Sequence, residues 1–117
     1  MNTVNMSHNE RLRECKFRFD MERAQLNHHF TEQQHEISKA LDLARNERSY
    51  WLSKLKMGDD LSLAKAKVDE LTNRIAELHK EKNNLDYDRR MRIIDLQHRN
   101  HNEIDRIEQE AEKGAES

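Results

Sequence analysis

This 117-residue chain contains seven histidines. They are candidates for chemistry because imidazole binds metal ions and titrates near neutral pH. Two of them follow a carboxylate by three residues, in Glu32-x-x-His35 and Asp95-x-x-His98, which is the spacing used by di-metal sites of four-helix proteins. In a helical hairpin His35 and His98 would lie roughly 27 Å apart. His98-x-x-His101 offers two ligands, whereas structural zinc usually takes four. We therefore predict neither a metal site nor a cofactor.

Nucleophilic catalysis would have to use Cys15 or one of a few serines. The sequence contains no strained turn that would activate a nucleophile and no glycine-rich loop that would hold a phosphate. A single cysteine cannot form an internal disulfide, so we expect a thiol at the surface or at an interface of an intracellular protein. We predict that the chain is not an enzyme.

The composition points to long helices rather than to a thick core. Charged residues make up 38% of the chain and hydrophobic ones 34%, with two glycines and no proline, which is typical of coiled coils. The net charge of −2 creates no overall field that would favour nucleic acid or membrane. No apolar run approaches 18 residues and no signal-peptide core is present, so we expect a cytoplasmic protein without membrane contact.

Gly58 interrupts the helix-forming sequence almost at its midpoint. Ser7 and Glu10 have capping-box spacing and predict the start of the first helix, while Asp59 or Asp60 can cap the second. The predicted segments are a flexible N-terminus (1–7), helix one (8–57), a hairpin tip (58–60), helix two (61–112) and a frayed C-terminus (113–117).

Each predicted helix carries an apolar stripe with steps of three and four residues. If the chain folds back at Gly58, pairing residues whose numbers sum to 115 or 116 brings the two stripes together. Examples are Leu55 with Leu61, Trp51 with Ala64, Leu41 with Ile75, Ile37 with Leu78 and Phe19 with Leu96. We therefore predict an all-α protein, an antiparallel coiled-coil hairpin. A single helix continuing through Gly58 is the alternative, because one glycine costs only about 1 kcal/mol in a helix.

A second apolar row follows each stripe at the i, i+4, i+7, i+11 spacing of one helix face. We expect the two rows to align as one exposed strip, made of Phe17, Met21, Ala24 and His28 with Tyr87, Met91, Ile94 and His98. Two hairpins could cover this strip by forming a homodimer, a four-helix bundle over part of the length. The strip could instead bind a different protein, and the sequence leaves this choice open.

The predicted function is protein–protein interaction, as an adaptor, an assembly factor or an inhibitor of a larger complex. One alternative comes from the tip residues Gly58, Asp59 and Asp60. An acidic hairpin tip resembles transcript-cleavage and stringent-response factors, which insert a coiled-coil hairpin into the secondary channel of RNA polymerase. The resemblance covers only the tip and implies a transcription regulator.

A second alternative is nucleic-acid binding by the Arg-rich residues near the two ends of the chain. These are Arg11, Arg13, Lys16, Arg18, Arg23, Arg89, Arg90, Arg92 and Arg99. Acidic residues are interspersed among them, which is more typical of a solvated surface than of a phosphate-binding face. We therefore expect nucleic acid to be an unlikely partner.

Overall fold

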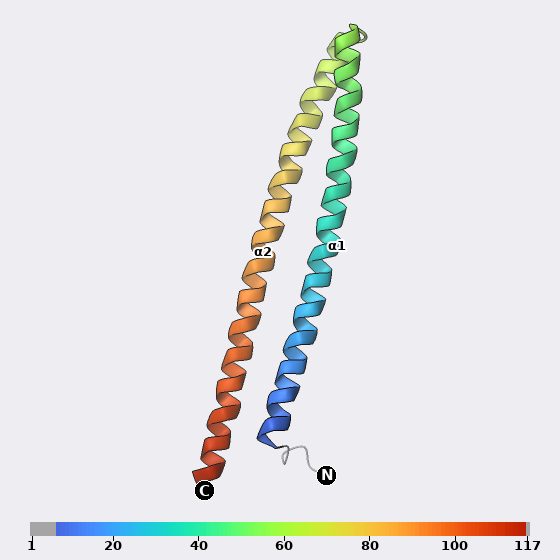
Figure 1. Cartoon of the computed structure of the whole chain (residues 1–117). Helices are drawn as coiled ribbons and strands as arrows, with labels where there is room; N and C mark the ends of the chain where they lie inside the picture. Colours follow the sequence, from blue (N-terminus) through green and yellow to red (C-terminus); the bar gives the residue numbers. More distant parts are fainter. Residues whose placement is uncertain (1–6, 117) are drawn as a thin grey trace. The chain divides into compact units, whose positions relative to one another are not determined.

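The computed structural model describes residues 7–116. In that range the chain forms two long helices that pack against each other, α1 (His8–Met57) and α2 (Leu61–Glu116), and no strand (Figure 1). This confirms the predicted all-helical class and the hairpin, and it excludes a continuous helix through Gly58. The predicted flexible N-terminus falls outside the described residues except for Ser7. We expected fraying from residue 113, but α2 is helical as far as Glu116.

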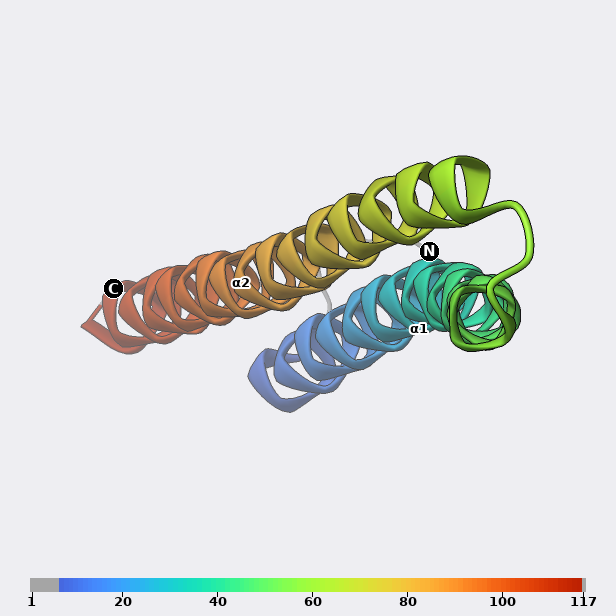
Figure 2. The same cartoon turned by 90° about the horizontal axis from the view of Figure 1, so that it is seen from above.

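Figure 2 shows the short turn that connects α1 and α2. Backbone hydrogen bonds at the end of α1 build this turn. The amide of Asp59 donates to the carbonyl of Lys54 at 3.1 Å, and the amide of Gly58 donates to the carbonyl of Leu55 at 3.2 Å. This is the Schellman arrangement, which requires a left-handed residue directly after the helix, and Gly58 has φ of 73°. Asp60 also has a positive φ, of 45°, and its carbonyl accepts the hydrogen bond from Ala64 that opens α2.

The start of α1 follows the predicted cap. The amide of Glu10 donates to the Ser7 hydroxyl oxygen at 3.2 Å, and the amide of Arg11 donates to the Ser7 carbonyl at 3.0 Å. A serine oxygen satisfies a backbone donor that the first helical turn leaves without a partner, so Ser7 determines where α1 begins.

The contacts group the chain into two compact units, each with a stretch of both helices. The terminal unit contains α1 up to His29 and α2 from Asp88 onward, and the turn unit is Phe30–Tyr87. Each unit is described by itself below. Neither helix has, within residues 7–116, a stretch apolar and long enough to cross a bilayer.

The core of the turn unit is the predicted seam. Leu41, Ala44, Leu71 and Leu78 form a buried cluster, against which Ile37, Ala40, Trp51 and Ile75 pack. Both members of the expected pairs Leu41–Ile75 and Ile37–Leu78 are therefore in this cluster. Ala64 is completely buried, as a small residue in the seam should be, and Trp51 is partly buried.

Leu61 departs from the expected seam. It was expected to face Leu55, yet 55% of its surface is exposed. Leu61 is the first residue of α2, so no earlier helical turn covers it. The buried seam of the turn unit therefore begins at Ala64 rather than at Leu61.

Candidate protein-binding surfaces

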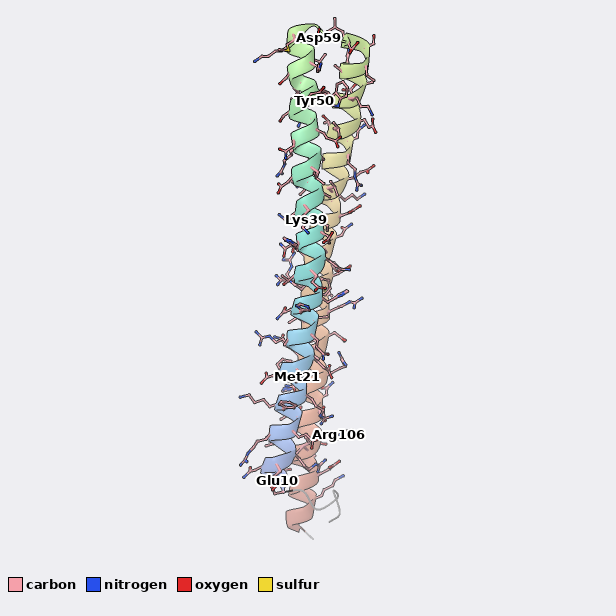
Figure 3. The ribbon with its side chains drawn as sticks, turned by 90° about the vertical axis from the view of Figure 1, so that its right-hand side faces the viewer. Glu10, Met21, Lys39, Tyr50, Asp59 and Arg106 are labelled. Carbon is pink, nitrogen blue, oxygen red and sulfur yellow. The ribbon has the colours of Figure 1, made fainter. Side chains whose placement is uncertain are left out.

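The terminal unit carries an exposed apolar row on α1. It consists of Phe17, Met21, Ala24 and His28, and all four residues are exposed. Residues two apart in a helix are separated by about 200° around the axis, so Phe17 points away from a seam that contains Cys15 and Phe19. Figure 3 looks onto α1 with α2 behind it and shows Met21 on the near side. We call this set the α1 row.

The α2 row of the terminal unit consists of Met91, Ile94 and His98. All three are exposed, and the same geometry turns them away from Leu96, which is buried in the seam. The four large apolar side chains of the two rows, Phe17, Met21, Met91 and Ile94, are each between 44% and 64% exposed. Tyr87, the eighth predicted residue, is exposed but belongs to the turn unit.

The two rows do not form the single strip that the sequence suggested. Each row lies on the side of its helix opposite the seam, and the seam is where α1 and α2 meet. The rows therefore lie on opposite sides of the terminal unit. The expected alignment compared how far along each helix the row residues lie. It did not take into account the direction in which their side chains point around the helix axis. The structure thus gives the terminal unit two separate apolar surfaces.

Cys15 is a core residue and not the surface or interface thiol that we expected. Only 1% of it is exposed, and its Sγ donates to Oδ1 of Asn100 at 3.3 Å. Leu12 and Phe19 are seven residues apart, and Cys15 supplies the seam position between them as a small apolar side chain. Burial raises the pKa of the Cys15 thiol, and the nearby Glu103 carboxylate raises it further.

Cross-helix ion pairs flank the seam of the terminal unit. Arg11 Nη2 lies 2.6 Å from Glu110 Oε2, and Arg99 Nη1 lies 3.9 Å from Glu22 Oε2. Arg18 is paired with Glu103. Its guanidinium donates a hydrogen bond to the Glu103 carboxylate, which raises the pKa of Arg18. Arg11, Arg18 and Arg99, which were considered for nucleic acid, are thus each paired with a carboxylate of the other helix.

Two hollows lie beside these pairs in the terminal unit. The one next to Cys15 and Asn100 has a volume of about 60 Å³, which is too small for most ligands. The other has about 320 Å³ and is lined by Glu22, Leu26, Arg92, Asp95, Leu96 and Arg99. Its lining includes two arginines and two carboxylates, so its charge favours neither an anion nor a cation.

The metal-ligand spacings lie in different units, with Glu32 and His35 in the turn unit and Asp95 and His98 in the terminal unit. Among the side chains that the structure describes, no three from histidine, cysteine or carboxylate residues come together in a way that could hold a metal ion. His101 Nε2 instead lies 3.4 Å from Asp105 Oδ2, one helical turn along α2.

One surface of the turn unit was missed by the sequence reasoning. Leu43, Tyr50 and Met57 are between 55% and 75% exposed on α1. Their seven-residue spacing is present in the sequence, but it runs beside the stripe of Leu41, Ala44 and the other seam residues, which has the stronger apolar pattern. The expected tip residues Gly58, Asp59 and Asp60 are exposed as well.

Comparisons of the chain with models of protein families, with characterised proteins and with solved structures find no match.

Proposed function

We propose that this chain acts without catalysis, by binding other proteins through the α1 row and the α2 row of its terminal unit. The observation that carries the proposal is the exposure of Phe17 and Met21 on one side and of Met91 and Ile94 on the other. Methionine adapts to irregular partner surfaces, and an aromatic side chain often anchors an interface. Helical spacing in each row fits a partner that lays a helix alongside.

The placement of the rows on opposite sides bears on the kind of complex. A closed twofold dimer buries the same patch of both copies, so it can cover one row and leaves the other exposed. Pairing the α1 row of one copy with the α2 row of the next would continue into a filament. A chain with two separate binding sides suits an adaptor or assembly factor that connects two partner helices. The four-helix bundle expected from a single strip has less support from this geometry.

The alternative functions have no specific observation in their favour. The pairing of Arg11, Arg18 and Arg99 with carboxylates reduces the positive charge available to phosphates. At the tip, Met57 and Leu61 are exposed beside Asp59 and Asp60, so the tip is not a purely acidic surface.

The test is affinity capture from cell extract with the wild-type chain and with the variants Met21→Glu and Met91→Glu. A buried carboxylate opposes association with an apolar partner, so each variant should lose the proteins that its own row binds by at least about tenfold, which corresponds to about 1.4 kcal/mol. Leu52→Glu is the matched control, because Leu52 is exposed in the turn unit.

Circular dichroism should show equal helix content in all four proteins. Bound proteins that are the same for the wild type, the row variants and Leu52→Glu would contradict the proposal. Loss of binding in Leu52→Glu alone would move the binding site to the turn unit.

A further inference from the structure

Three exposed apolar residues of α1 in the turn unit, Leu43, Tyr50 and Met57, belong to a second seam. Ala40, Leu43, Glu47, Tyr50, Lys54 and Met57 follow one another in steps of three and four residues. This is the spacing with which one helix packs along another, and it lies about 110° around α1 from the buried seam. Its length is roughly 26 Å. We call this set the second seam.

The centre of the second seam is ordered by contacts within α1. The Tyr50 ring packs edge-on against Trp51, with centroids 5.2 Å apart and an interplanar angle of 80°. Lys54 Nζ lies 5.7 Å from the centre of the Tyr50 ring. Because Trp51 packs on the buried cluster, it holds Tyr50 in place on the surface. A fixed aromatic side chain loses little conformational entropy when a partner covers it.

The second seam is complementary to itself when a second copy runs antiparallel. A twofold axis beside Tyr50 brings Tyr50 of the two copies together and places Leu43 of one copy near Met57 of the other. The same axis places Glu47 level with Lys54 of the second copy, on both sides of the centre. Among the described residues no cation is paired with Glu47. Leu43, Tyr50 and Met57 thus meet apolar residues of the second copy, and Glu47 and Lys54 each meet the opposite charge.

We propose that two copies of this chain associate antiparallel through the second seam, with Tyr50 at the centre and two Glu47–Lys54 pairs across the interface. This contact leaves the α1 row and the α2 row of each copy exposed, so the dimer is independent of the partner binding proposed above. A twofold contact of this kind closes on itself and stops at two copies. The apolar area is modest, so the dimer dissociates on dilution.

A charge-reversal cycle tests the pairing. Sedimentation equilibrium over a range of concentrations should give the wild type a mass approaching twice the 14.1 kDa of one chain. Glu47→Lys and Lys54→Glu each place like charges opposite one another in both 47–54 pairs of the dimer. Each variant should therefore weaken the dimer by about tenfold. The double variant Glu47→Lys/Lys54→Glu restores opposite charges and should bring the affinity back to within about threefold of the wild type.

The matched controls are Asp42→Lys and Lys56→Glu, which make the same charge changes at exposed positions outside the second seam. Both should dimerise like the wild type. A wild-type chain that stays monomeric at every concentration would overturn the proposal. So would a double variant no better than the single ones, or dimerisation that is lost in Met21→Glu and kept in Glu47→Lys.

Discussion

At the scale of single residues, Cys15 shows how a polar contact can lie inside a seam between helices. The thiol is buried in the seam and donates to Asn100 of the other helix. A polar contact in a seam favours the alignment that keeps both partners together, because shifting the helices would leave Asn100 without it. Cys15 and Asn100 are therefore suited to maintain the alignment of the terminal unit.

The raised pKa of Cys15 predicts loss of stability at alkaline pH. The ordinary thiol value is 9.0, and the folded value lies above it. As pH rises past 9.0 the unfolded chain ionises its thiol first, so the free energy of unfolding falls. In thermal melts, the melting temperature should fall further between pH 7 and pH 10 for the wild type than for Cys15→Ala. Equal losses in the two proteins would contradict burial of the thiol.

At the scale of elements, the turn is determined by the backbone and not by the aspartate side chains. The amides of Gly58 and Asp59 close α1 with one hydrogen bond each, and the carbonyl of Asp60 accepts the first hydrogen bond of α2. The sequence placed the turn correctly because glycine is the residue that adopts a left-handed conformation at least cost. It did not predict the positive φ of Asp60, since aspartate adopts this conformation less readily.

Gly58→Ala should destabilise the hairpin. There is open space around Gly58, so the cost comes only from its φ of 73° and should be about 1–2 kcal/mol. The loss in the free energy of unfolding can be measured by urea unfolding, monitored by circular dichroism. Gly114→Ala is the matched control, because Gly114 lies within α2, also has open space and should lose no stability. A Gly58→Ala variant as stable as the wild type would show that the turn tolerates another geometry.

The alignment of the two helices was predicted only approximately. Cys15 and Asn100 fit the expected sum of 115, whereas the three cross-helix ion pairs join residues whose numbers sum to 121. Charged residues flank the seam, and their long side chains lean toward the start of their own helix. The periodicity of the apolar residues does not predict this difference between the seam residues and the charged residues beside them.

At the scale of the whole molecule, the two units have different cores. The turn unit contains a contiguous cluster of Leu41, Ala44, Leu71 and Leu78. The terminal unit buries Leu96 and Ile107 together with Cys15, and flanks them with ion pairs. Exposed ion pairs contribute about 0–1 kcal/mol each, so they replace little of the missing apolar contact. We expect the terminal unit to open more readily than the turn unit.

Hydrogen exchange can test this difference. Leu78→Ala should cost about 2–5 kcal/mol, because Leu78 is almost fully buried, and the loss of amide protection should be concentrated in the turn unit. Leu96→Ala should produce the reverse pattern, concentrated in the terminal unit. Equal loss of protection in both units for either variant would show that the chain opens as one cooperative structure.

The sequence by itself determined the two helices, the turn at Gly58, the cap at Ser7 and most of the seam. These features depend on local hydrogen bonds and on a periodicity that continues over many residues, both of which are contained in neighbouring positions. Only the tertiary structure decided that Cys15 is buried, that Leu61 is exposed and that the two rows lie on opposite sides. The physical reason is that burial and direction depend on where the other helix lies, and a stripe read along one helix does not contain that information.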